Sequence, residues 1–284
     1  MTATTATATP TILAAPTISR PTNVVPALAL RRLALTIRSP RAVAIPVLAP
    51  VLFALIVAPA LGNTLGTPGQ HRTYMTFVAL AAAGLLIPVN CMFSGLGVLT
   101  DRQQGAMREL LVAPIRRSSI VLGNLLAALV ITTLQVTVLI FAAALRGAHF
   151  HSGRHLLWFA AAAVALAVFV YGLAETFATK ITNAEEYTGL VPPIAIVPFF
   201  FAGTLYPITS LPAWLDGIAK VLPLTHAVAL FRYGLTPQGT QALHNIWGMS
   251  DPTRMALLSL AVVVAYAAIT LTVAIRLFTK SGTN

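Results

Sequence analysis

Residues 73–100 read TYMTFVALAAAGLLIPVNCMFSGLGVLT, and this run contains no charged side chain. A compact charged segment, DRQQGAMRELLVAPIRR at residues 101–117, follows it, and residues 118–145 form a second uncharged run. A helix needs about 20 apolar residues to cross the hydrocarbon core of a bilayer. The pattern therefore predicts two membrane-spanning helices joined by residues 101–117, which we call the elbow.

The whole chain is poor in charge. It is 57% hydrophobic and 9% charged with a mean hydropathy of +0.83, whereas soluble domains carry about 25% charged residues. A soluble protein with a large core is the alternative, but six uncharged runs are long enough to span a bilayer. The predicted fold is an all-α integral membrane protein with six spans, at about residues 42–61, 73–99, 119–145, 156–176, 187–206 and 255–276.

The net charge of +11 lies mostly in the segments between these spans. If both ends of the chain are cytoplasmic, the inside segments hold twelve Lys and Arg residues and the outside segments hold six. This excess favours cytoplasmic termini. The arginines form no stripe with interleaved aromatic residues, so the charge indicates membrane topology rather than nucleic-acid binding.

Three further segments flank the spans. Residues 1–25 are expected to be a disordered cytoplasmic tail, and residues 26–280 a single membrane domain. Residues 26–39 place Arg31 and Arg38 opposite an apolar face, which predicts a helix lying on the inner membrane surface with its arginines on lipid phosphates; a plain positively charged anchor is the alternative. Residues 207–235 hold apolar pieces too short to cross, which predicts re-entrant helices on the outer side, followed by looser chain at 239–247.

The elbow itself has a local helix signal. Thr100 and Gln103 have the spacing of a capping box, and Pro114 stops or kinks the segment. Thr100–Ala113 is therefore predicted to form a short cytoplasmic helix. Because it is joined tightly to two spans, such a helix can pass a push from a soluble partner to both; an ordinary charged loop is the alternative.

Other polar and aromatic residues are weaker candidates. Asn90 either bonds a neighbouring helix or lines a polar path, and Glu175 is expected to have an interfacial structural role at the inner end of its span. Arg232 is expected to snorkel toward the outer surface, and His226 to be structural. The outside turn with His149, His151 and His155 lacks accompanying carboxylates, so no metal site is expected.

Two motifs resemble those of permeases in the second class of ABC exporters. Members of that family have an elbow of approximately D-R-x-x-G-x-x-x-x-L-x-x-x-P, and the matching residues here are Asp101, Arg102, Gly105, Leu110, Pro114, Arg117, Leu122 and Gly123. A second family motif matches Phe201, Ala202, Gly203, Pro207, Leu211, Pro212, Trp214 and Leu215, followed by Pro223, Leu224, Thr225, His226, Ala227 and Arg232. The resemblance covers residues 26–280 and is nearest to drug- and lipo-oligosaccharide-export permeases of the daunorubicin-resistance kind.

The resemblance implies an assembly. The elbow would be a coupling helix seated in a cytoplasmic ATPase, residues 26–39 a connecting helix that also touches it, and residues 207–235 would close the outer end of the path. Two ATPase copies would serve two permeases, the second being another copy of this chain or a sister permease. The resemblance implies ATPase-coupling roles for Asp101, Arg102, Gln104, Gly105, Arg108, Glu109, Leu110 and Arg116. The path would run between the permeases, along the second and fifth spans, where the candidate residues are Asn90, Phe93, Phe199, Phe200 and Phe201.

The predicted function is that of a permease subunit, not an enzyme, exporting a hydrophobic or amphipathic molecule across a bacterial cytoplasmic membrane. The chain contains no G-x-x-x-x-G-K-[ST] phosphate loop, so ATP and Mg²⁺ are expected on the partner ATPase and no cofactor on this chain. A membrane-embedded lipid-modifying enzyme is one alternative, but the sequence offers no converging nucleophile, base or metal ligands. A proton-coupled carrier is another, and it would need charged groups near mid-membrane.

Overall fold

The computed structural model describes residues 24–38 and 71–281, apart from 152, 154 and 238, together with scattered positions between 48 and 60. All regular secondary structure in these residues is helical. Almost all of the predicted tail, 1–25, and most of the predicted first span, 42–61, lie outside the described residues.

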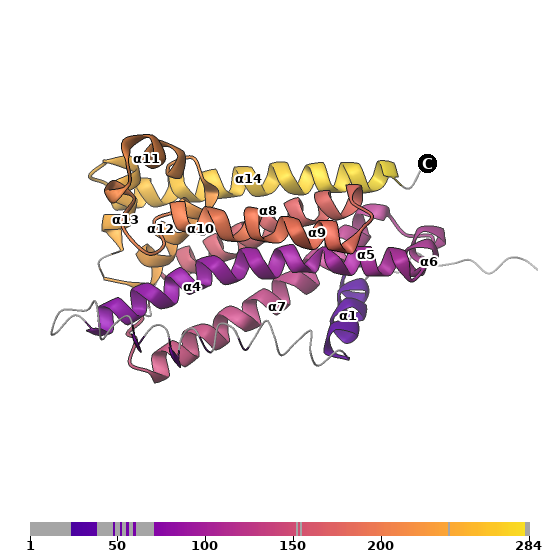
Figure 1. Ribbon diagram of the computed structural model, residues 1–284, viewed down its shortest axis with the longest axis horizontal. Helices are drawn as coiled ribbons and strands as arrows, with labels where there is room; N and C mark the ends of the chain where they lie inside the picture. Colours follow the sequence, from indigo (N-terminus) through magenta and orange to yellow (C-terminus); the bar gives the residue numbers. More distant parts are fainter. Residues whose placement is uncertain are drawn as a thin grey trace, which may run out of the picture.

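Four long helices form the body of the molecule and lie roughly along its longest axis (Figure 1). Each belongs to a stretch that is long and apolar enough to cross a membrane. They coincide with the second, third, fourth and sixth predicted spans: α4 (His71–Ser94), α7 (Arg117–Leu145), α8 (Leu156–Lys180) and α14 (Pro252–Ser281). A helix of 25 residues is about 37 Å long, which exceeds the roughly 30 Å hydrocarbon core.

Small residues set the spacing of these helices. In α8, Ala162, Ala165 and Ala167 are buried. A methyl group added to Gly172 would lie 2.7 Å from the backbone nitrogen of Leu271 in α14, so only glycine permits this crossing. Small side chains that allow close helix approach are the usual packing device in membranes, where burial of apolar surface gives no driving force between helices.

The predicted fifth span, 187–206, is divided into three shorter helices. They are α9 (Ala184–Val191), the π-helix η2 (Pro192–Ile196) and α10 (Val197–Phe201), and they follow one another along the molecule beside α4 (Figure 1). Pro192, Pro193 and Pro198 lack the N–H that a continuous α-helix needs, which accounts for the interruption. None of the three helices reaches spanning length alone, so six spans remain a prediction.

The segment after α10 folds into a cluster of short helices, which we call the cap. It contains η3 (Ile208–Ser210), α11 (Ala213–Ala219), α12 (Pro223–Leu235) and α13 (Thr240–Trp247). The chain bends by 78° between α11 and α12, as a broken or re-entrant pair does. The expectation of looser chain at 239–247 is wrong, because most of that stretch forms α13, whose Leu243 is buried.

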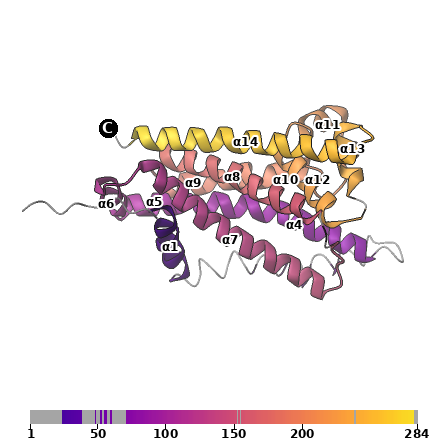
Figure 2. The ribbon, with the colours of Figure 1, turned by 180° about the vertical axis from the view of Figure 1, so that it is seen from behind.

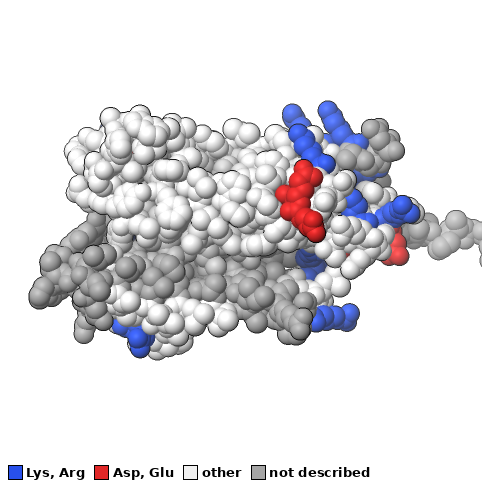
Figure 3. Space-filling model, in the orientation of Figure 1, with Lys and Arg blue, Asp and Glu red and all other residues white. Residues whose placement is uncertain are grey.

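The two ends of the molecule differ in character. The cap is at one end, whereas the elbow, α1 (Val24–Ile37) and the carboxyl end of α14 gather at the other (Figures 1 and 2). On the face seen in Figure 3, most charged side chains gather toward the elbow end, a smaller basic group lies near the opposite end, and the described surface between the two ends is uncharged. Placement of α1 and the end of α14 at one end agrees with termini on the same side of a membrane; the cytoplasmic assignment of that side remains a prediction.

Candidate functional site

The elbow consists of the end of one long helix, a reversal and a short helix. Helix α5 (Leu96–Gln103) continues the direction of α4, Gly105 turns the chain with a φ of +81°, and α6 (Ala106–Val112) follows. The predicted helix bounds of Thr100–Ala113 are therefore wrong. Thr100 does not cap a helix; its hydroxyl donates to the Leu96 carbonyl at 2.9 Å, because Thr100 is still inside α5. Gly105 was the sequence signal for the boundary, since glycine alone enters the left-handed region freely.

Asp101 faces inward and joins the elbow to α1. Its side chain is only 6% exposed and accepts from the Arg32 guanidinium at 3.2 Å, while Arg31 lies 3.5 Å from the same carboxylate oxygen. Arg32 also donates to the Gly97 carbonyl at 3.2 Å. We call Arg31, Arg32, Gly97 and Asp101 the latch. The structure does not support exposure of Asp101 to a partner.

The latch requires glycine at position 97, because a larger residue would fill the space that Arg32 occupies. A methyl group at this position would overlap the Arg32 guanidinium, so the side chain of Arg32 occupies the space that glycine leaves beside α5. Arg31 forms an ion pair with Asp101, and the expected contact of Arg31 and Arg38 with lipid phosphates remains a prediction. The helix predicted at 26–39 is present as α1, and its position is fixed by these protein contacts.

Helix α1 also crosses the helix on the other side of the elbow. A methyl group at Gly123 of α7 would lie 2.6 Å from the Leu28 side chain and 3.2 Å from the Val25 carbonyl oxygen of α1. Figure 2 shows α1 beside the end of α7 that is nearest the elbow. At the start of α7, Arg117 donates to the Thr279 carbonyl of α14 at 2.8 Å. Helix α1 therefore contacts both arms of the elbow, and α14 is tied to one of them.

Helix α6 presents a mixed polar and apolar surface. Met107 is buried and anchors it, whereas Val112 is 87% exposed. The other exposed or half-exposed residues include most of the predicted coupling set: Arg102, Gln104, Gly105, Arg108, Glu109, Leu110 and Arg116. Within the described residues no ion pair forms between these charged side chains and a neighbour. A surface of this kind suits contact with a soluble protein.

The predicted path residues come from two helices, Asn90 and Phe93 from α4 and Phe199, Phe200 and Phe201 from α10. The Asn90 amide donates to the Thr132 hydroxyl of α7 at 2.6 Å, so it makes the interhelical bond that was one of its two predicted roles. Phe93 and Phe200 are exposed, Phe199 is buried with its ring 5.5 Å from that of Phe200, and Phe201 is half-buried. A path along these residues remains a prediction.

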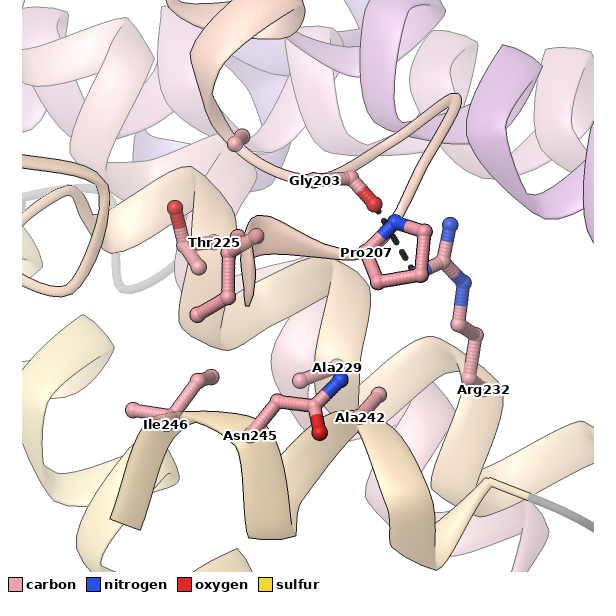
Figure 4. A pocket seen from close by; sticks show the side chains of 10 residues that line it. Gly203, Pro207, Thr225, Ala229, Arg232, Ala242, Asn245 and Ile246 are labelled. Carbon is pink, nitrogen blue, oxygen red and sulfur yellow. Dashed lines mark hydrogen bonds between the residues drawn. The ribbon is translucent and has the colours of Figure 1, made fainter. Parts of the chain in front are cut away.

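Arg232 does not reach the outer surface, and this expectation is wrong. Its guanidinium donates to the Gly203 and Thr204 carbonyls at 2.9 and 2.6 Å and lies 3.9 Å from the centre of the Phe77 ring. The reason is that the turn after α10, with Gly203 at a φ of +68°, directs its carbonyl toward α12 (Figure 4). Beside Arg232 is a cavity of about 20 Å³, lined by residues of that turn, α12 and α13.

His226 has a structural environment, as predicted. One ring nitrogen lies 3.2 Å from the Ser259 hydroxyl of α14 and the other lies 2.9 Å from the Lys220 carbonyl oxygen. Trp247 donates to the same hydroxyl at 2.8 Å. These bonds tie α12 and α13 of the cap to α14.

Glu175 is another residue whose surroundings differ from the sequence prediction. It was expected at the water boundary, but it is fully buried in α8, where one carboxyl oxygen lies 2.9 Å from the Tyr171 hydroxyl. Lys180, Glu185 and Glu186 are exposed nearby in the sequence, which is why the boundary was placed too early. Helices α4, α5 and α7 pack against α8, and Tyr187 of α9 is buried between the Met92 carbonyl of α4 and the Ala174 carbonyl of α8.

Comparison with known proteins gives the family. The sequence pattern of the family described as ABC-2 type transporter matches residues 24–236, which include α1, the elbow and α12. A Mycobacterium tuberculosis protein named as a doxorubicin resistance ABC transporter permease, DrrC, is 27% identical over 187 residues, which are 64% of this chain and 66% of that protein. A multidrug ABC transporter permease of Escherichia coli, YbhR, is 24% identical over 54% of this chain and 42% of its own length.

Nodulation protein J of Sinorhizobium fredii is 27% identical over 65% of this chain and 72% of its own length. The match thus spans two thirds or less of the length of DrrC and of YbhR. Both of these proteins are named as permeases rather than as enzymes. The family match covers three quarters of the chain and includes the elbow that the structure places at one end. This chain belongs to the ABC-2 type transporter family of membrane proteins.

Proposed function

We propose that this chain is the permease subunit of an ATP-driven exporter and that the elbow receives force from a separate ATPase. The observation that carries the proposal is the surface of α6, which exposes an apolar side chain and charges that form no ion pair among the described residues, at one end of a bundle of apolar spans. Membership of the family and the printed names of DrrC and YbhR support it.

The elbow is built to transmit movement to several helices. On one side, α6 continues through Gly105 into α5 and α4; on the other, it continues through Pro114 into α7. The ion pair of Asp101 with Arg32 fixes α1 to α5, and the close contact of Gly123 with Leu28 and Val25 fixes α1 to α7. A push on α6 therefore moves α4 and α7 as parts of one unit, because packed elements of this kind shift between discrete arrangements rather than deform continuously.

The assembly we propose has two ATPase subunits below two permeases. ATP and Mg²⁺ would bind on the ATPases, whose closure would act on the two elbows. The second permease would be another copy of this chain or a sister chain, with the bacterial cytoplasmic membrane as the setting. Lipids would surround the apolar outer faces of helices such as α7, where Leu134 and Phe141 are exposed.

The proposed cargo is a hydrophobic or amphipathic molecule, such as a drug, a lipid or a glycolipid. Two observations support this class. The long helices expose mainly apolar side chains, and the exposed candidates for a path, Phe93 and Phe200, are aromatic. A strongly charged cargo would instead require compensating charges along the spans, because burial of an unpaired charge is costly.

The proposal is tested by a matched pair of substitutions. Val112→Asp places a charge on the exposed surface of α6, and Val221→Asp makes the same change at an exposed position of the cap. We expect Val112→Asp to reduce copurification of the ATPase and cargo-stimulated ATP hydrolysis by about tenfold, because charging an apolar contact commonly costs about 1.4 kcal/mol or more.

We expect Val221→Asp to retain both properties, since the cap lies at the opposite end of the molecule. Equal behaviour of the two variants, or full coupling in Val112→Asp, would contradict the proposed role of the elbow.

A further inference from the structure

A short hydrogen-bonded chain crosses from α8 to the first turns of α7. The Tyr171 hydroxyl lies 2.9 Å from a carboxyl oxygen of Glu175, one helical turn away, and 3.1 Å from the Val121 carbonyl oxygen of α7. All three residues are buried. The second carboxyl oxygen of Glu175 is also buried, and no described residue forms a hydrogen bond with it.

The number of hydrogens shared by Glu175, Tyr171 and Val121 decides whether Glu175 is ionised or neutral. A tyrosine hydroxyl carries one hydrogen, a backbone carbonyl carries none, and an ionised carboxylate carries none. If Glu175 were ionised, one of the two short contacts of Tyr171 would have two acceptors facing each other without a hydrogen. If Glu175 carries a proton, it donates to the Tyr171 oxygen, and Tyr171 donates to Val121, so both contacts are hydrogen bonds.

The surroundings offer Glu175 no full counter-charge. The charged groups that act on it are Arg32 of α1 and Arg102 of α5, yet among the described residues Arg32 is paired with Asp101 and neither arginine forms an ion pair with Glu175. Tyr187 of α9 donates its hydrogen to the Met92 carbonyl at 2.6 Å, and the buried Cys91 thiol of α4 lies 3.7 Å from the Thr132 hydroxyl.

The other helices that pack against α8 contribute uncharged groups where their contacts are resolved. Helix α7 offers the Val121 carbonyl, α14 approaches at Gly172 through Thr270, and α12 approaches at the far end, where Gly234 meets Phe159. An ionised carboxylate with one oxygen unpartnered is expensive to bury, whereas an unpartnered neutral carbonyl oxygen is much less so.

We infer that Glu175 is a proton-binding site, and that in this conformation its carboxyl group is neutral and donates to Tyr171, which donates to Val121. The bound ligand is one proton, taken up as the carboxylate becomes a carboxylic acid. Val121 is in the second turn of α7, shortly after the elbow. The proton therefore helps to fix the elbow end of α7 to α8, and its loss would leave Tyr171 with a single hydrogen for two acceptors.

Infrared spectroscopy of the full chain in lipid nanodiscs at neutral pH tests the inference. We expect a carbonyl-stretch band of a buried protonated carboxylic acid, shifted in D₂O and absent from Glu175→Gln. The matched control is Glu186→Gln, which removes an exposed carboxylate near the same end and should leave the band in place. Absence of the band in the wild-type chain, or its survival in Glu175→Gln, would overturn the inference.

A second variant keeps the test decisive if Glu175→Gln does not fold. Tyr171→Phe removes the acceptor of the carboxylic hydrogen while it leaves the buried acid. We expect the band to persist at a higher frequency, because a carboxylic acid that donates no hydrogen bond absorbs above one whose hydroxyl donates. A band unchanged by Tyr171→Phe would show that Glu175 does not donate to Tyr171.

Discussion

Asp101 joins two helices that are almost seventy residues apart in the sequence, and the three side chains of its ion-pair cluster are not equivalent. Arg32 is mostly buried, lies 3.2 Å from Asp101 and also bonds the Gly97 carbonyl. Arg31 is more exposed and lies 3.5 Å away. Exposed pairs contribute little because water screens them and side-chain entropy opposes them.

We therefore predict that Arg32→Ala lowers the free energy of unfolding by about 1.5–3 kcal/mol, the range for hydrogen bonds to charged groups. Arg31→Ala is the control, with an expected loss below about 1 kcal/mol. Thermal unfolding of the purified chain, followed by tryptophan fluorescence, measures both. A larger effect of Arg31→Ala than of Arg32→Ala would show that the latch is not arranged as described.

Helices α5 and α6 depend on the reversal at Gly105. Its φ of +81° is in the left-handed region, and nothing lies within 4 Å of an added methyl group, so the cost of a side chain there is one of backbone conformation alone. An alanine in this region costs about 1–2 kcal/mol, whereas asparagine tolerates it better.

We predict that Gly105→Ala reduces the unfolding free energy by about 1 kcal/mol and that Gly105→Asn reduces it by less. Chemical denaturation in detergent compares the two variants with the parent chain. If alanine were as stable as glycine while asparagine was not, the left-handed turn between α5 and α6 would be excluded.

At the scale of the whole molecule, sequence patterns predicted what depends on nearby residues. The uncharged runs identified α4, α7, α8 and α14, because length and apolarity alone decide whether a helix can cross a bilayer. They did not show that the prolines at 192, 193 and 198 divide the fifth run, since prolines are tolerated in some membrane helices and interrupt others.

Side-chain partners across the fold were the part that could not be predicted. Arg232 was expected to point outward, and only the position of the Gly203 turn shows why it points inward. Asp101 was identified from its motif as a coupling residue, but its burial depends on where α1 packs. Glu175 appeared to lie at the water boundary because of charged neighbours in the sequence, whereas in the fold it is buried where Tyr171 contacts the Val121 carbonyl of α7. In each case the decisive neighbour comes from a distant segment.

The central claim is that the elbow docks on a separate ATPase, and site-directed cross-linking in native membranes tests it most directly. Cys91 is the only cysteine of the chain and is buried, so a single reactive cysteine is readily placed by Val112→Cys in a Cys91→Ala background. We predict that a photoreactive probe on Val112→Cys captures a nucleotide-binding chain and that the same probe on Val221→Cys, at the cap, does not. Capture of lipid alone from Val112→Cys in actively transporting membranes would contradict the account.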